Sequence, residues 1–364
     1  MHKKRTRRPD IKRAKTNTAD DRFLIFEHPE LEWPKSQDEF SGVPFYATVM
    51  HQCFPEPPIK AGYINRKGKV VISPRFDDAG DFSEGLAPVG NDGLCGYINL
   101  TGEWAIKPRF RHVEEFRCGL AAVSEDGINY GYIDQTGRWV IPPADIVASS
   151  FYEGLAAVGL CGPGGAGALY GVIDTAGNTV LPFQYESVGV FHEGLACVQD
   201  RHEKWGYVDT SGQTVIRCQF EYAGEFSEGV AGVYTEAGFG YIDRSGRWVI
   251  HSTFQAGSQF CGGLAPVRTD GKWGYIDSQG RFIIPPTFRY AEPFSEDHAV
   301  VTTTSDEFPN ACFIDCTGEV VIPGPFSKAK PFQCGLAFFR DEVTIGYIDA
   351  DSDCPWRNWN VPHK

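Results

Sequence analysis

Residues 264–294, LAPVRTDGKWGYIDSQGRFIIPPTFRYAEPF, hold every part of a unit that recurs along almost the whole chain. Successive copies of this unit lie 34 to 40 residues apart. A near-constant period of about 35 residues indicates a tandem array of one supersecondary unit rather than separate domains. The glycine before its first tyrosine recurs at Gly62, Gly96, Gly131, Gly171, Gly206, Gly240, Gly274 and Gly346, and Cys312 replaces it in a degenerate copy.

One unit is expected to fold as a three-stranded antiparallel meander. The apolar run 264–267 precedes a turn at 269–271, and residues 272–277 alternate with the period of two that is typical of a strand. A second turn at 278–280 leads the chain into a third strand at 281–284. The pattern therefore predicts an all-β fold built from tandem meanders.

The second turn carries an Asp-x-x-Gly signature. Its carboxylate can accept hydrogen bonds from turn amides, and its glycine tolerates the positive φ of a tight hairpin connection. We expect this capping role at Asp134, Asp174, Asp209, Asp243, Asp277 and Asp315, and at Asn65 and Asn99.

A proline follows the predicted third strand in five copies. Because proline donates no backbone hydrogen bond, we expect it to end the ladder of the meander. Two other copies have Arg217-Cys218 and His251-Ser252 at this place, which predicts looser connections. The prolines are Pro74, Pro108, Pro143, Pro182 and Pro286.

Spaced phenylalanines follow, such as Phe220 with Phe226 and Phe288 with Phe294. We expect these rings to fill the space between successive meanders. Replacing a fully buried one with alanine is expected to cost about 3–5 kcal/mol.

Both ends of the array begin or stop inside a unit. Residues 40–43, FSGV, resemble Phe-Ser-Glu-Gly-Val, and residues 346–349 are the first strand of a further unit. The ends are either capping half-units of an open β-solenoid or superhelix, or parts of a shared unit that closes a propeller-like ring. We expect the open form, because propeller blades have four strands in roughly 40–45 residues and rings have roughly four to eight blades. The predicted organisation is a basic disordered arm at 1–20, an N-terminal capping half-repeat at 21–61, the repeat array at 62–349, and a C-terminal cap or tail at 350–364.

Charge is divided unevenly along the chain. The formal net charge is −13, but residues 1–16 have a balance of +7, which leaves −20 for the remainder. This basic arm can dock on nucleic acid, on an anionic membrane or on acidic protein, can remain a solvated tail, or can fold back on the acidic body. Its candidate contact residues are Lys3, Lys4, Arg5, Arg7 and Arg8.

Composition indicates a soluble, cytoplasmic protein. No apolar run approaches the roughly 20 residues of a membrane-spanning helix, and the N-terminus lacks the apolar core of a signal peptide. The eleven cysteines include no Cys-x-x-Cys, so most are expected to be buried small hydrophobes in a reducing compartment.

Residues 204–209, KWGYVD, and 272–277, KWGYID, together with the downstream Phe-x-Glu-Gly-Leu-Ala, resemble the WG-repeat (KWG) family of bacterial repeat proteins. The resemblance covers about residues 62–349. It implies β-rich binding or scaffolding modules and brings no catalytic residues. Other copies lack the tryptophan, so its ring has no universal role; they have Ala61, Cys95, Tyr130, Tyr170, Phe239 and Ile345 there.

The sequence offers no enzyme or metal-site signature. The glycine-rich stretch 162–167 precedes a predicted strand rather than the helix N-terminus that a phosphate cradle needs, so we expect a loop insertion. The histidines have no metal-ligand spacing. A catalytic carboxylate pair is singular, so we expect the recurrent glutamates to bond backbone amides. We therefore expect no enzyme, cofactor, metal or catalytic residue; the glutamates are Glu84, Glu153, Glu193, Glu228 and Glu296.

Two functions fit this pattern. The first is a non-enzymatic scaffold that binds protein through its extended β-repeat surface, with specificity set by loops near 124–130, 159–169, 200–204 and 302–311. The second is a carbohydrate or cell-wall polymer binding module that stacks sugar rings on aromatic side chains. Under both functions Trp205 and Trp273 are candidate partner-binding residues, in addition to those of the basic arm. Coplanar exposed rings favour glycan, whereas a larger mixed apolar patch favours protein.

Overall fold

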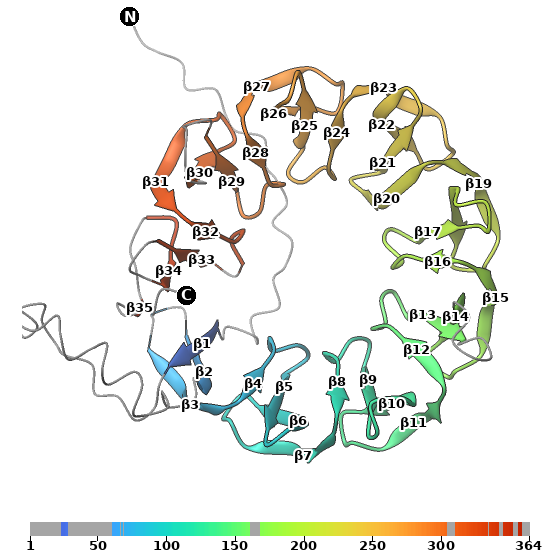
Figure 1. Ribbon diagram of the computed structural model, residues 1–364, viewed down its shortest axis with the longest axis vertical. Coiled ribbons are helices and arrows are strands. Elements are labelled where there is room, and N and C mark those ends of the chain that lie inside the picture. Colours follow the sequence, from blue (N-terminus) through green and yellow to red (C-terminus); the bar gives the residue numbers. More distant parts are fainter. Residues whose placement is uncertain are drawn as a thin grey trace, which may run out of the picture.

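The computed structural model of the chain describes residues 23–27, 60–160 except 66 and 68, 168–303, 310–333, 335–341, 345–351 and 356–358. Every regular element in these residues is a β-strand, and the strands form nine antiparallel sheets. The sheets follow one another in chain order around a ring (Figure 1). The predicted all-β repeat fold is therefore confirmed. No helix suited to spanning a membrane occurs in this part of the chain.

The sheets are numbered 1 to 9 in chain order. Sheet 1 has β1 (Phe23–Glu27), β2 (Lys60–Ile64) and β3 (Val70–Phe76). Sheet 2 has β4 (Asp78–Ala79), β5 (Leu86–Asn91), β6 (Leu94–Asn99) and β7 (Trp104–Phe110). Sheet 3 has β8 (His112–Val113), β9 (Leu120–Ser124), β10 (Tyr130–Asp134) and β11 (Trp139–Ala144). Sheet 4 has β12 (Ile146–Ala148), β13 (Leu155–Leu160), β14 (Leu169–Asp174) and β15 (Thr179–Tyr185). Sheet 5 has β16 (Ser187–Val188), β17 (Leu195–Gln199), β18 (Trp205–Asp209) and β19 (Thr214–Phe220).

Sheet 6 has β20 (Tyr222–Ser227), β21 (Val230–Thr235), β22 (Gly238–Asp243) and β23 (Trp248–Phe254). Sheet 7 has β24 (Ala256–Gly257), β25 (Ala265–Thr269), β26 (Lys272–Ile276) and β27 (Phe282–Phe288). Sheet 8 has β28 (Tyr290–Ala291), β29 (His298–Thr302), β30 (Ala311–Asp315) and β31 (Val320–Phe326). Sheet 9 has β32 (Lys328–Ala329), β33 (Ala337–Arg340), β34 (Ile345–Ile348) and β35 (Trp356–Asn358).

Sheets 2 to 9 each have one strand more than the predicted meander. This first strand is only two residues long in most sheets, and it follows the last strand of the preceding sheet after a single residue, such as Glu221 between β19 and β20. The last strands of sheets 1 to 8 lie along the periphery of the ring, and we call them outer strands (Figure 1). The turns between first and second strands point towards its centre, and we call them inner turns (Figure 1).

The recurring glycine lies opposite a β-bulge in the outer strand of sheets 1 to 7, and Cys312 holds the same position in sheet 8. In sheet 7, Trp273 pairs with Phe288 and Tyr275 with Ile284, so three outer-strand residues stand opposite Gly274 alone. A Cβ atom on Gly274 would lie 2.6 Å from the Ile284 carbonyl oxygen. A Cβ atom would come equally close to backbone atoms of the outer strand at four further glycines, Gly62, Gly131, Gly206 and Gly240.

The same bulge explains why prolines occur here, and it shows that the prediction that they end the ladder was wrong. The nitrogen of Pro286 would lie 2.7 Å from a Cβ on Gly274, so this proline stands at the bulge itself, and β27 continues to Phe288. Proline does not end the ladder, because a bulged residue is unpaired already. The prediction of looser connections at Cys218 and Ser252 was also wrong, since β19 and β23 keep the same length and register.

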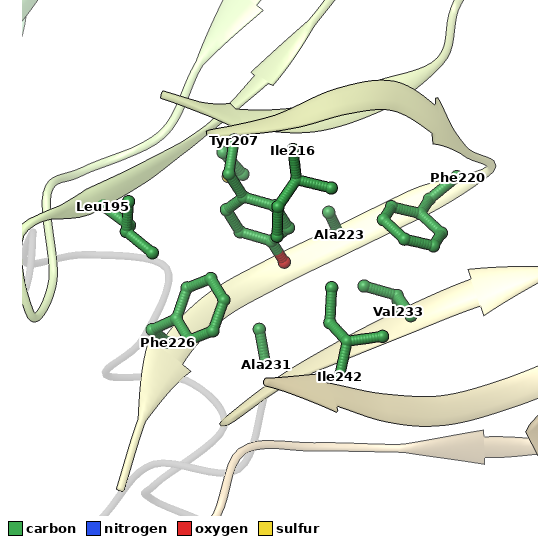
Figure 2. Close-up of a cluster of buried hydrophobic side chains, with 10 residues drawn as sticks. Leu195, Tyr207, Ile216, Phe220, Ala223, Phe226, Ala231, Val233 and Ile242 are labelled. Carbon is green, nitrogen blue, oxygen red and sulfur yellow. The ribbon is translucent and has the colours of Figure 1, made fainter. Parts of the chain in front are cut away.

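The hydrophobic core is divided into eight clusters, each shared by two successive sheets. Figure 2 shows the cluster between sheets 5 and 6, in which Tyr207 and Ile216 of sheet 5 face Phe226 and Ile242 of sheet 6. Phe226 is fully buried, so the expected placement of the phenylalanines between units is confirmed. A sheet in this ring buries its faces only against its neighbours.

The tyrosine after the glycine joins successive sheets in two ways. The Tyr207 ring lies 4.8 Å from that of Phe226, and its hydroxyl donates a hydrogen bond of 2.7 Å to the Gly224 carbonyl. Burial raises the pKa of this phenol far above its ordinary value, so the hydroxyl remains a donor. Equivalent hydrogen bonds are donated by Tyr63, Tyr97, Tyr132, Tyr241 and Tyr275.

The two end sheets lie next to each other but remain separate (Figure 1). Burial raises the pKa of Tyr347 in sheet 9, and the nearby charge of Asp81, at the start of sheet 2, raises it further. However, β1 pairs with β2 and β35 pairs with β34, so no sheet among the described residues combines strands from both ends. The arrangement is thus propeller-like, without the shared unit that would close it.

We expect Gly274→Ala to lower the free energy of unfolding by about 1–3 kcal/mol, because the added methyl group collides with the backbone of β27. Gly224→Ala is the matched control, since its Cβ would meet no atom nearer than 3.4 Å. Chemical denaturation of both variants tests the expectation, and equal losses would contradict it.

Tyr207→Phe is expected to cost about 1–3 kcal/mol, because it leaves the Gly224 carbonyl without its donor. The phenylalanine ring itself is compatible with the site, as Phe313 occupies the same place in sheet 8. Tyr234→Phe, at an exposed position, is the control. Thermal or denaturant unfolding gives the answer, and no difference between the two variants would refute the importance of this hydrogen bond.

Candidate functional site

The inner turns are built from Phe-x-Glu-Gly-Leu. Glu84 and Gly85 have φ values of 51° and 81°, as both central residues of a type I′ turn require. Ser83 and Leu86 exchange backbone hydrogen bonds across the turn. Glycine alone adopts such φ values freely, so the glutamate in this turn is held there by further contacts.

Each turn glutamate contacts the inner turn of the next sheet. Glu84 accepts a hydrogen bond of 2.9 Å from the Gly119 amide, and Glu153 one of 2.8 Å from the Gly194 amide. Cys118, Gly262 and Cys334 replace the glutamate in three turns, and the first two of these interrupt the series. The expectation that the recurrent glutamates bond backbone amides is thereby confirmed. Three further bonds join Glu193 to Gly229, Glu228 to Gly263 and Glu296 to Gly335.

The Asp-x-x-Gly turns have the predicted caps. Asp134 Oδ1 accepts hydrogen bonds from the Thr136 and Arg138 amides and from the Thr136 hydroxyl. These bonds, that of the hydroxyl foremost, lower the pKa of the carboxyl from its ordinary value of 3.8. The other predicted positions cap their turns in the same way: Asn65, Asn99, Asp174, Asp209, Asp243, Asp277 and Asp315.

The tryptophans of two outer strands pack against phenylalanines of the preceding sheets. Trp104 meets Phe76 of the preceding sheet edge to face, with ring centroids 5.9 Å apart. Trp139 meets Phe110 in the same manner at 6.2 Å. These rings therefore pack between successive sheets.

Trp205 and Trp273, the two candidate partner-binding tryptophans, lie on third strands and are half-buried. Each packs beside a tyrosine on the first strand of the next sheet: Trp205 lies 6.2 Å from Tyr222, and Trp273 lies 6.0 Å from Tyr290. Tyr222 is 53% exposed and Tyr290 is 47% exposed. Sequence reasoning missed both tyrosines, because it predicted no strand where they stand.

A third ring extends the group between sheets 5 and 6. Tyr234 on β21 is the cross-strand partner of Tyr222 on β20, so the two side chains are neighbours on one face, and Tyr234 is 38% exposed. We call Trp205, Tyr222 and Tyr234 the aromatic cluster. It combines the ring contact of Trp205 with Tyr222 and the cross-strand pair of two exposed tyrosines.

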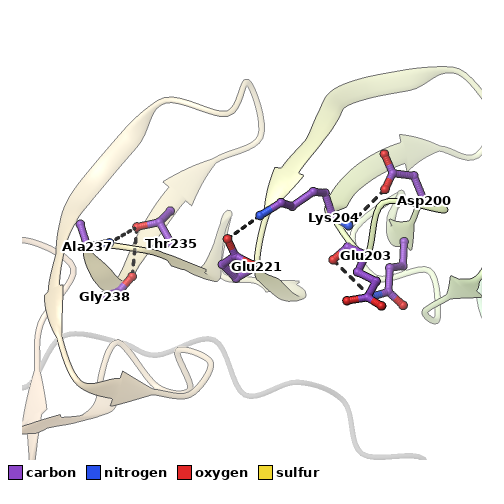
Figure 3. Close-up of polar contacts among 8 residues, drawn as sticks. Asp200, Glu203, Lys204, Glu221, Thr235, Ala237 and Gly238 are labelled. Atoms are coloured by element: carbon purple, nitrogen blue, oxygen red, sulfur yellow. Dashed lines mark hydrogen bonds and ion pairs between the residues drawn. The ribbon is translucent and has the colours of Figure 1, made fainter.

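A polar rim borders the aromatic cluster. Lys204, directly before Trp205, forms an ion pair with Glu221, the single residue between β19 and β20 (Figure 3). Asp200 shapes the adjoining loop by accepting hydrogen bonds from the amides of His202 and Lys204. The turn at 235–238 follows Tyr234, and Glu221 and Lys204 lie between it and this loop in the view of Figure 3. The predicted specificity loop 200–204 thus adjoins exposed aromatic rings.

Several predicted features lie outside the described residues. They include the arm residues Lys3, Lys4, Arg5, Arg7 and Arg8, the FSGV stretch 40–43, the glycine-rich stretch 162–167, and residues 304–309 of the last specificity loop. The described part of the chain contains no group of three or more His, Cys, Asp or Glu side chains placed to hold a metal ion.

The cysteines are less buried than expected. Seven are described, and all of them are free thiols. Cys197 and Cys312 are buried, whereas Cys118 and Cys316 are exposed. Cys118 is exposed because it stands at the glutamate position of an inner turn, and Cys316 because it lies within an Asp-x-x-Gly turn.

Comparison with known families gives eight consecutive matches to the WG containing repeat. They cover residues 62–95, 96–127, 130–160, 170–201, 205–236, 239–273, 273–303 and 313–342. No curated protein matches the sequence significantly.

Among solved structures, a eukaryotic initiation factor is similar in fold. It has 9% sequence identity and a TM-score of 0.56, over 82% of this chain and 93% of that chain, so the likeness concerns the fold alone. BamB from Moraxella catarrhalis has 11% identity and a TM-score of 0.41, over 67% and 88%. Hsv2p of Kluyveromyces lactis has 10% identity and a TM-score of 0.39, over 78% and 97%.

Cys118→Glu is expected to stabilise the protein by about 0.5–1.5 kcal/mol, because it supplies the missing acceptor for the Gly154 amide in the next inner turn. The backbone at Cys118 has a φ of 54°, which matches that of the turn glutamates. Cys118→Gln is a useful partner variant, because its amide oxygen accepts the same bond without charge. Unfolding free energies measure the gain, and destabilisation by both variants would contradict the assignment.

The turn aspartates predict a defined pH dependence. Because the folded pKa of Asp134 is lowered, its caps contribute stability above pH 3.8, and this contribution is lost as pH falls through the folded pKa. The stability difference between the wild type and Asp134→Asn should therefore shrink between about pH 6 and about pH 2.5. Denaturation at a series of pH values checks this, and a constant difference would be the contrary result.

Proposed function

Because this chain belongs to the family of proteins with the WG containing repeat, we propose that it is a non-enzymatic scaffold that binds a protein partner around the aromatic cluster. The observation that carries this proposal is the exposure of Tyr222 and Tyr234 beside the half-buried Trp205. Aromatic side chains supply most of the binding energy in many protein interfaces. The polar rim of Lys204 and Glu221 suits the edge of such an interface.

The geometry of the rings favours protein over glycan. The Trp205 and Tyr222 planes are inclined by 57°, and those of Trp273 and Tyr290 by 69°. A flat sugar platform needs rings that face one way, whereas inclined rings form pockets for the side chains of a protein. Carbohydrate binding is therefore the less favoured of the two candidate functions.

The carboxylates support a non-enzymatic role. The glutamates of the inner turns bond backbone amides of neighbouring turns, and the turn aspartates bond their own turns. Each of these side chains has the same structural task in several sheets. A catalytic acid and base need different environments within one site, and repeated caps do not provide them.

The test is affinity capture with the full chain and with the double variant Tyr222→Ser/Tyr234→Ser. We expect capture of the specific partner to fall by roughly 30-fold, which corresponds to losing about 2 kcal/mol at aromatic contact residues. Val249→Ser, at a 44% exposed site on the outer strand β23, is the control and should retain the partner.

Three results would oppose the proposal. Equal capture by the double variant would remove the aromatic cluster from the interface. Loss of the partner by the Val249→Ser control would mean that any exposed apolar side chain replaced by serine weakens capture. Recovery of polysaccharide in place of protein would favour the carbohydrate alternative. Unchanged thermal unfolding of both variants shows that the fold is intact.

A further inference from the structure

Charge is separated between the centre and the periphery of the ring. The segments that form first strands and inner turns contain twelve Asp or Glu and three Lys or Arg. These segments are residues 78–85, 112–119, 146–154, 187–194, 222–229, 256–263, 290–297 and 328–335. The outer strands contain four Lys or Arg and no Asp or Glu. We call the first set of residues the acidic centre. Its turns point inward from successive sheets (Figure 1).

Carboxylate oxygens remain available in this acidic centre. The glutamates of the inner turns each accept one backbone amide, and an ionised carboxylate has further lone pairs. Arg117, Lys328 and Lys330 are the only Lys or Arg in these segments. The centre is therefore a strongly negative surface that extends over several sheets.

Strand β1, which begins at Phe23, starts next to this acidic centre. In sheet 2, Ala87 pairs with Ile98, directly after the inner turn and Leu86. In sheet 1, Phe23 of β1 pairs with Ile64, which is the equivalent position. Residues before Phe23 thus join β1 at the place where every other sheet has its inner turn. This tether follows from strand register and is independent of charge.

We propose that the basic segment of residues 3–15 binds in cis across the acidic centre of its own ring. Its Lys and Arg residues lie 8 to 20 positions before Phe23. At about 3.3 Å per residue they reach roughly 26 to 66 Å from β1, which spans several inner turns. The tether delivers the arm to a part of the fold whose charge is opposite to its own.

This inference does not rest on the proposed function, because it depends on charged side chains and not on the rings of the aromatic cluster, of which only Tyr222 belongs to the acidic centre. Electrostatic docking of this kind weakens as salt screens the charges, since the Debye length falls from about 10 Å at 0.1 M to about 3 Å at 1 M. A short tether keeps the local concentration of the arm in the millimolar range, so binding in cis needs only modest affinity.

Limited trypsin digestion of the full chain tests the proposal. Trypsin cuts after the Lys and Arg residues of the arm, and the cut chain is followed by intact mass. At low salt we expect cleavage within residues 3–15 to be roughly tenfold slower than in the free peptide of residues 1–16. The cleavage rate of the full chain is divided by that of the free peptide measured at the same salt concentration. At high salt this ratio should approach one.

The matched variants separate the acidic centre from net charge. Glu84→Gln, Glu228→Gln and Glu296→Gln together keep an acceptor for each turn amide but remove three charges, and should restore rapid cleavage. Glu103→Gln, Glu236→Gln and Glu319→Gln remove three exposed charges outside the centre and should leave the protection in place. Release by both triple variants, or absence of protection in the wild type, would overturn the proposal. Protection that grows with protein concentration would also overturn it, because the occupant would then be the arm of a second copy.

Discussion

The bulge of the outer strand over the recurring glycine sets the geometry of sheets 1 to 7, and sheet 8 keeps the same register with Cys312 in place of the glycine. Without a Cβ at Gly274, the backbone of β27 can lie directly over β26 at the bulge. The bulge then allows Phe288 to return to register with Trp273, and the chain turns after one residue into the next sheet. In these sheets the bulge therefore determines where each unit ends and how the next one begins.

The sheets are stable through their junctions rather than on their own. Each core cluster draws side chains from two neighbours, and tyrosine hydroxyls and turn glutamates add hydrogen bonds across the same boundaries. The recurrent residues of the family pattern are occupied by this task. The binding that we propose therefore uses features that differ between repeats, namely the exposed Tyr222 and Tyr234 and the uneven charge of the inner turns.

The sequence predicts the strands that alternate strongly and the turns that cap them, but it does not predict the ring. The Asp-x-x-Gly turns and the buried phenylalanines depend on local pattern, so they were predicted correctly. The first strands, such as Asp78–Ala79, are too short to show a period, and the prolines were misinterpreted because a bulge leaves no mark on periodicity. Trp205 and Trp273 could be named as candidates from their motif, but the exposure of their tyrosine neighbours depends on those short strands and on the angle between sheets.

Hydrogen exchange of Phe226→Ala tests most directly whether cores are shared between sheets. Phe226 belongs to sheet 6, yet its ring packs against Leu195 and Tyr207 of sheet 5 (Figure 2). We predict that amide protection falls in the strands of both sheets 5 and 6, while sheets 1 to 3 keep theirs. Loss of protection in sheet 6 alone would contradict the account, because each sheet would then have a core of its own.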